Sequence, residues 1–164
     1  MKIIYYCYGG AHSSVLSAAI HVGMLPTYRI PRKEEFFSIP NFDITTNDEI
    51  GTPLYMGMDI WYNEVYCMGL GPLKEKALSS ILFLEKHREE FLCEQAIFIY
   101  ALPIVDVGVR IGGFLSRGLG ITFLGRTIII QGLQRRYFEF VKLVNRVISH
   151  NILKDSKEVP RNLS

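Results

Sequence analysis

Residues 2–7 read Lys-Ile-Ile-Tyr-Tyr-Cys, and residues 8–14 continue as Tyr-Gly-Gly-Ala-His-Ser-Ser. The first run is short, apolar and β-prone, and glycines follow it, which predicts a buried strand that enters a tight turn. A helix-compatible run then opens at Ser13 or Ser14 and stops at Gly23. The chain therefore begins with a P-loop-like or Rossmann-like unit of strand, turn and helix.

The rest of the chain alternates between β-prone and helix-compatible runs. Four further strands are predicted, and the first two flank a polar turn as a hairpin does: residues 54–58, 64–68, 96–100 and 127–131. Three further helices are predicted at residues 72–91, 104–117 and 134–150. Residues 24–51 are rich in proline, asparagine and aspartate, and we interpret them as a long excursion, or lid, with one short helix near residues 32–38.

Helices between apolar strands favour a largely parallel sheet that is covered on both faces. We therefore predict an α/β fold, a three-layer sandwich with a mostly parallel sheet and one antiparallel hairpin. The length of 164 residues suits a single hydrophobic core, so residues 1–153 are expected to form one domain. Residues 154–164 are polar and contain Pro160, which is typical of a flexible tail.

Composition and charge exclude several classes of protein. Hydrophobic residues make up 49% of the chain and charged residues 21%, the balance of a packed globular protein. The net charge of +2 gives no field that would draw the protein to nucleic acid or an anionic membrane. Three cysteines without CxxC spacing argue against a disulfide framework and a cysteine-rich zinc site, and no apolar stretch is long enough for a membrane helix. We expect a cytoplasmic protein.

The turn at residues 8–14 is the best candidate for function. A turn from a strand into a helix gathers unpaired backbone N–H groups and the positive end of the helix dipole, and anions bind there. Gly9 and Gly10 allow a ligand to approach closely, and His12, Ser13 and Ser14 add side-chain donors. These residues predict a site for a phosphate-containing ligand, either a nucleotide, which would bring Mg²⁺, or a phosphometabolite. No resident metal site is predicted, and the plainer alternative is that the glycines form the turn and the hydroxyls cap the helix.

The turn matches no standard phosphate motif. No lysine occurs between Lys2 and Lys33, so a Walker A loop is absent, and the third glycine of a Rossmann fingerprint is missing. Cys7 stands where a cysteine phosphatase has its nucleophile, but the sixth residue after it is Ser13 and not a phosphate-clamping arginine. If the protein is an enzyme, we expect a phosphotransferase or phosphohydrolase. Its candidate catalytic residues are Cys7, His12 and Asp59, the last of which is otherwise a turn residue.

Three arginines could complete such a site. Arg110 and Arg117 lie about two helical turns apart and would share one helix face, and Arg126 follows a loop later. Gly112 and Gly113 between them would each cost a helix about 1 kcal/mol relative to alanine, which favours close packing or a close ligand. The alternative is ordinary helix packing with solvated arginines.

Five stretches spread over nearly the whole chain suggest a known family. They read KIIYYCYGGAHSSV, AAIHVGMLP, RIPRKEEFFSIPNFD, RIGGFLSRGLG and FLGRTIIIQG. In combination they resemble the bacterial domain of unknown function family 3189. The resemblance implies a small single-domain bacterial protein and no particular activity. It marks two sets of residues as matching the family motifs: Gly9, Gly10, His12, Ser13 and Ser14, and Arg110, Gly112, Gly113, Ser116 and Arg117.

A second class of function stays open beside the phosphate site. The chain could be a non-catalytic regulatory or scaffolding module that acts through self-association, as a homo-oligomer, or through a protein partner. The apolar residues Phe114, Leu115 and Leu119 would contribute to that surface. The two classes of function differ in what covers the turn at residues 8–14. In a phosphate-binding protein the backbone amides of the turn point into an open cleft, whereas in a non-catalytic module they are covered.

Overall fold

The centre of the fold is an open four-stranded sheet with the order β2-β3-β1-β4. The computed structural model describes residues 1–86, 96–104 and 122–158. Strands β1 (Lys2–Cys7), β3 (Glu64–Gly69) and β4 (Ala96–Tyr100) are parallel, and β2 (Leu54–Met58) pairs antiparallel with β3. The α/β class, the mostly parallel sheet and the hairpin predicted from the sequence are thereby confirmed.

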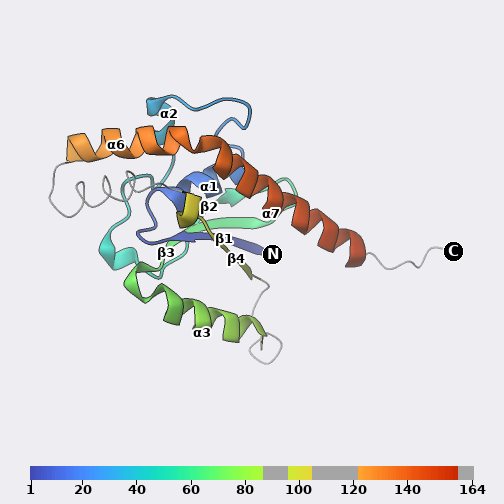
Figure 1. Ribbon diagram of the computed structural model, residues 1–164. Coiled ribbons are helices and arrows are strands. Elements are labelled where there is room, and N and C mark those ends of the chain that lie inside the picture. Colours follow the sequence, from blue (N-terminus) through green and yellow to red (C-terminus); the bar gives the residue numbers. More distant parts are fainter. Residues whose placement is uncertain (87–95, 105–121, 159–164) are drawn as a thin grey trace.

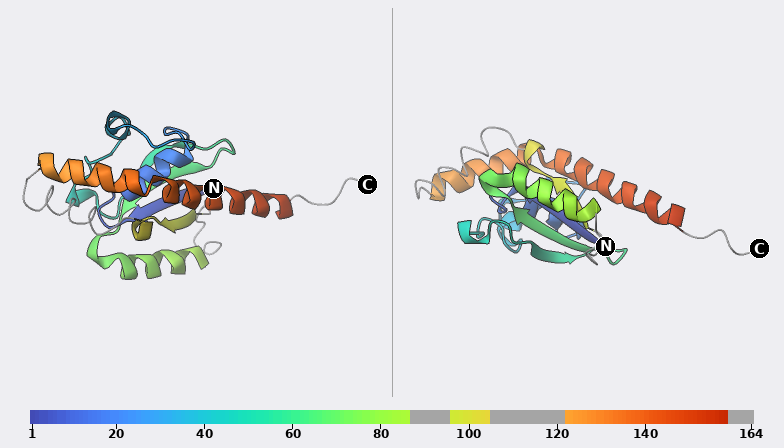
Figure 2. Two further views of the ribbon diagram at one scale, coloured as in Figure 1. Left: turned by 45° about the horizontal axis from the view of Figure 1, so that its top comes forward. Right: turned by 90° about the horizontal axis from the view of Figure 1, so that it is seen from below.

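Helices lie on both faces of this sheet (Figure 1 and Figure 2). One face carries four of the described helices: α1 (Ser13–His21), α2 (Lys33–Phe37), α6 (Thr122–Arg135) and α7 (Tyr137–Glu158). The other face carries α3 (Lys74–Lys86). Short 3₁₀ turns occur at Asn47–Glu49, Gly71–Leu73 and Leu102–Ile104. The layers are those of the predicted three-layer sandwich.

Alternating side chains of β1 divide the interior into two cores. Ile3 and Tyr5 are fully buried on the side of α1 and α7, whereas Ile4 and Tyr6 point to the opposite core with Met68. Almost every residue of β1 is therefore buried, as expected for the central strand of a parallel sheet covered on both faces. Each connection between strands must therefore cross one face of the sheet or the other, so that both cores are covered.

Helix α1 is buried along its whole length between the sheet and α7. Its small and aliphatic residues, SSVLSAAIH, allow this close packing. The buried hydroxyl of Ser17 donates to the carbonyl oxygen of Ser13, at 2.9 Å, so this polar group is paired inside the helix. The predicted first helix is confirmed.

The strand predicted at residues 127–131 is wrong, because these residues belong to helix α6. The run Thr-Ile-Ile-Ile-Gln is β-prone, but the buried residues continue at helical spacing through Leu133, Tyr137, Phe140 and Val144. Packing of this long apolar stripe overrides the local preference of the isoleucines. The single helix predicted at 134–150 is accordingly the end of α6 followed by α7. Helix α7 runs on to Glu158, into the segment predicted as a tail.

The remaining predicted helices have different outcomes. Helix α2 falls within the short helix predicted near residues 32–38, and α3 falls within the one predicted at 72–91. The helix predicted at 104–117 lies outside the described residues except for Ile104, which ends a 3₁₀ turn. None of the helices in the described part of the chain has the length and apolar character needed to cross a bilayer.

Candidate functional site

The turn after β1 lies where the connections of the sheet diverge. Strand β1 leads into α1 on one face, whereas its parallel neighbour β3 leads into α3 on the other face (Figure 2). In open α/β sheets, ligands bind outside the carboxyl ends of two such strands. The Gly-rich turn is therefore placed where this class of fold builds its sites.

Gly10 and Gly69 bring the turns after β1 and β3 into contact. Gly10 has a φ of +69°, and a Cβ added there would lie 2.6 Å from the Gly69 nitrogen. The N–H groups of Leu70 and Gly71 donate to the carbonyl oxygens of Cys7 and Tyr8, so pairing continues beyond the strands. Gly69 was not predicted as part of the site. The signal was available, since a glycine follows each of two apolar runs.

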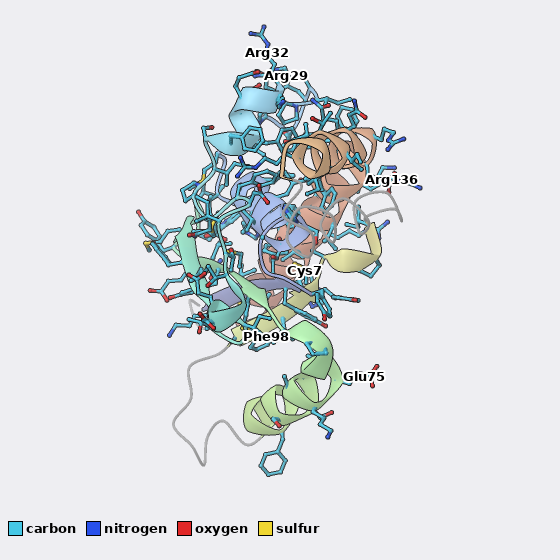
Figure 3. All side chains as sticks on the ribbon, turned by 90° about the vertical axis from the view of Figure 1, so that its left-hand side faces the viewer. Cys7, Arg29, Arg32, Glu75, Phe98 and Arg136 are labelled. Atoms are coloured by element: carbon cyan, nitrogen blue, oxygen red, sulfur yellow. The ribbon has the colours of Figure 1, made fainter. Side chains whose placement is uncertain are left out.

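Cys7 lies at the base of the turn, in the interior between the sheet and the helices (Figure 3). The backbone N–H of Gly10 donates to its Sγ at 3.2 Å, and Ser14 Oγ lies 3.1 Å from the same sulfur. Both groups could donate to a thiolate, which is the nucleophilic form of cysteine. The structure thus brings together three of the predicted residues.

Helix α1 begins without a side-chain cap. His12 occupies the N-cap position and makes no capping hydrogen bond. Among the described residues, no group accepts a hydrogen bond from the backbone N–H of His12, Ser13 or Ser14. The Ser13 hydroxyl, in a residue only 2% exposed, also has no partner in this part of the chain. Several donors at the positive end of a buried helix are therefore unused.

Asp43 joins two of the predicted ligand-binding residues. His12 Nε2 lies 3.1 Å from its Oδ1, and Arg126 Nε, from α6, donates to its Oδ2 at 2.6 Å. The side chain of Asp43 is 6% exposed, whereas that of Arg126 is 48% exposed. Burial raises the pKa of Asp43, but the hydrogen bonds from His12 and Arg126 outweigh burial and hold the pKa below its ordinary value. Asp43 is thus an ionised acid beside the turn, and the sequence did not identify it.

The segment 41–46, which we call the strap, closes over the turn. The N–H of Asp43 donates to the carbonyl oxygen of Ala11, and Thr45 Oγ1 donates to that of Gly10. Phe42 is buried and packs its ring against those of Phe36 and His12. Part of the predicted excursion therefore serves as a cover. Ser13 and Ser14 are buried, while Tyr8 is exposed.

Asp59 lies at the other end of the sheet. It begins the turn between β2 and β3, next to the start of β1, because Lys2 pairs with Glu64. Its Oδ1 accepts hydrogen bonds from the backbone N–H groups of Trp61 and Asn63, which makes it a turn-forming residue. The structure does not bring this candidate catalytic residue together with the Gly-rich turn.

A buried chain of hydrogen bonds connects Asp59 to the core. Tyr5 OH lies 2.7 Å from His21 Nδ1, and His21 Nε2 lies 3.3 Å from Asp59 Oδ2. Burial lowers the pKa of His21 more than Asp59 raises it, and burial raises the pKa of Tyr5. Tyr5 therefore donates to a neutral His21, which donates to Asp59. This network is complete and leaves no donor for a ligand.

The remaining predicted residues lie outside the described part of the chain: Arg110 and Arg117 of the phosphate site, and Phe114, Leu115 and Leu119 of the alternative surface. Three arginines that were not predicted for the site, Arg29, Arg32 and Arg136, lie at the periphery, away from Cys7 (Figure 3). Across residues 1–86, 96–104 and 122–158, no three His, Cys, Asp or Glu side chains are grouped so that they could hold a metal ion.

Comparisons with known proteins place the chain in a family. Searches among curated proteins and among solved structures gave no match. A family model described as a protein of unknown function, DUF3189, matches residues 2–148. This span includes the turn, the strap, Arg126 and the whole sheet. The chain therefore belongs to the DUF3189 family of proteins of unknown function.

Proposed function

We propose that this protein binds a phosphate-containing ligand, a nucleotide or a phosphometabolite, at the N-terminus of α1. The uncapped start of that helix, with the unused N–H groups of His12, Ser13 and Ser14, carries the proposal. Backbone donors and the helix dipole together attract anions at such a position. Arg126 lies close enough to share Asp43 with His12 and adds a cation to the site. We also propose that the protein acts in the cytoplasm of a bacterial cell.

If the ligand is turned over, the chemistry that we propose is phosphoryl transfer or hydrolysis. The Cys7 thiolate would attack phosphorus, and the leaving oxygen would take a proton from His12. Water would then cleave the sulfur–phosphorus bond and return the proton to His12. The Gly10 N–H and Ser14 would hold the sulfur. Cysteine phosphatases have a phosphate-clamping arginine at the position of Ser13, and here Arg126 would supply that guanidinium. A nucleotide ligand would carry its own Mg²⁺.

Thermal unfolding of the full chain tests the binding proposal. We expect inorganic phosphate or a nucleotide to raise the melting temperature, since a ligand at a hundred times its Kd stabilises the folded state by about 2.7 kcal/mol. His12→Ala and Ser13→Ala should reduce this stabilisation. Ser80→Ala, the same truncation on α3, serves as the matched control and should leave it unchanged. No stabilisation by phosphate, sulfate or any nucleotide would refute the proposal.

A non-catalytic module is the second proposal, and it rests on the tip of the β2–β3 hairpin. Ile60 and Tyr62 are each 81% exposed there, and the adjacent Trp61 is also partly exposed. A cluster of exposed apolar side chains is typical of a surface for self-association or a protein partner. Light scattering tests this proposal, because the wild type would form a dimer that Ile60→Ser weakens. A monomer at all concentrations would contradict self-association.

A further inference from the structure

The two side chains that the proposed function offers to a phosphate already bind an internal anion. His12 Nε2 and Arg126 Nε each contact one carboxylate oxygen of Asp43, at 3.1 and 2.6 Å. These three residues come from the turn, α6 and the strap, so the cluster is made by the fold and not by one local motif. A phosphate at the turn would have to compete for the same two nitrogens.

We propose that Asp43 is an internal competitor of the ligand, and that phosphate binds beside the turn only when the Asp43 carboxylate has left His12 and Arg126. This inference rests on the proposed function, because it concerns the regulation of the same site. A carboxylate and a phosphate that share the same donors repel each other within a few ångströms, so one of the two must leave. The strap then makes the affinity of the site depend on a side chain of the protein itself.

Release of the carboxylate does not require the strap to unfold. Phe42 anchors the strap in the core, and Thr45 Oγ1 remains bonded to the carbonyl oxygen of Gly10. Rotation of the Asp43 side chain alone therefore frees the two donors. Arg126 is half exposed, lies over the ring of Phe37, and has no described residue hydrogen-bonded to its Nη atoms. Its guanidinium can follow the ligand.

The competition predicts the direction in which affinity changes. The apparent affinity of a site equals its intrinsic affinity multiplied by the fraction of molecules in which the site is free. Asp43→Asn keeps the size of the side chain but removes its charge, so we expect inorganic phosphate to bind about tenfold or more tightly. Asp43→Ala removes the competing group altogether and should bind at least as tightly as Asp43→Asn.

Isothermal titration of the full chain with inorganic phosphate tests the inference. The wild type is compared with both Asp43 variants and with Glu35→Gln. This control changes the net charge equally at an exposed ion pair with Arg29 and should leave the affinity unchanged. Tighter binding by the Asp43 variants alone supports the inference, also where the wild type binds too weakly to measure. Equal or weaker binding overturns it while leaving the proposed function intact, and absence of binding by every variant overturns both.

A measurement on the wild type does not depend on the folding of any variant. The NMR resonance of the Arg126 Nε–H group reports its bond to Asp43. We expect inorganic phosphate to shift this resonance as the carboxylate leaves, with the same midpoint as the binding isotherm. A resonance that stays in place while phosphate binds would show that Asp43 is not displaced.

Discussion

Gly10 is a residue at which two independent constraints meet. Its positive φ favours glycine, and the backbone of Gly69 occupies the space that a side chain would need. The first constraint concerns one residue, whereas the second ties the turn after β1 to the turn after β3. The position of the uncapped helix start relative to the sheet therefore depends on Gly10 having no side chain.

Replacing Gly10 by alanine should destabilise the protein more than the same change at another glycine with positive φ. Gly23 has a φ of +77° and nothing within 4 Å of an added Cβ, so Gly23→Ala should cost only about 1 kcal/mol. Gly10→Ala adds a clash with backbone and should cost at least about 2 kcal/mol. Urea unfolding of both variants measures the difference. Equal losses would show that the turn can move away from β3.

Single residues of the site differ in how far the sequence could reveal them. Gly9, Gly10, Ser13 and Ser14 were predicted together because turn sterics and helix capping act within a few residues. Asp43 was not predicted, because its contacts are with residues 31 and 83 positions away in the sequence. Only the folded chain brings those three side chains together.

The secondary structure of helices α6 and α7 also depends on more of the chain than a short sequence window contains. A window of five β-prone residues cannot reveal that the apolar stripe continues for several helical turns beyond it. The strands β1 to β4 were all predicted, since each is a short apolar run bounded by turn residues. Their order in the sheet depends on packing between distant segments, so only the mostly parallel character of the sheet could be predicted.

The junction of α6 and α7 is tied to the loop before α2. Tyr137 OH donates to the carbonyl oxygen of Pro26 at 2.7 Å, and Gln134 Nε2 donates to that of Pro31 at 2.9 Å. Tyr137→Phe leaves a carbonyl without its partner and should lower the free energy of unfolding by about 1 kcal/mol. Tyr62→Phe, at an exposed residue, is the control and should have no effect. Chemical denaturation of the two variants decides whether this bond stabilises the junction.

For the molecule as a whole, the Tyr5–His21–Asp59 network couples stability to pH. Burial holds the pKa of His21 below its ordinary value of about 6.5, so the unfolded chain binds this proton at a higher pH than the folded chain does. The contribution of His21 to stability is therefore fully present above that value and is lost as the pH falls below it. The pKa of Asp59 is also lowered, because its hydrogen bonds outweigh its burial. Asp59 therefore causes a further loss of stability only at lower pH, below the ordinary pKa of an aspartate.

The free energy of unfolding should accordingly fall between pH 7 and pH 5. We expect His21→Gln to have a smaller fall over this interval, whatever its stability at pH 7, because the titrating group is gone. Urea unfolding at several pH values gives both slopes. Identical slopes for the two proteins would assign the pH dependence to other groups.

The hairpin end of the sheet also determines what an optical experiment can report. Trp61, the only tryptophan of the chain, follows Asp59 there, whereas the Gly-rich turn lies beyond the opposite end of β1. Intrinsic indole fluorescence is thus a built-in reporter of opening at the β2–β3 tip. A ligand at the start of α1 would leave the emission spectrum of Trp61 largely unaltered. A fluorescence titration without a change in emission is therefore no evidence against binding at that site.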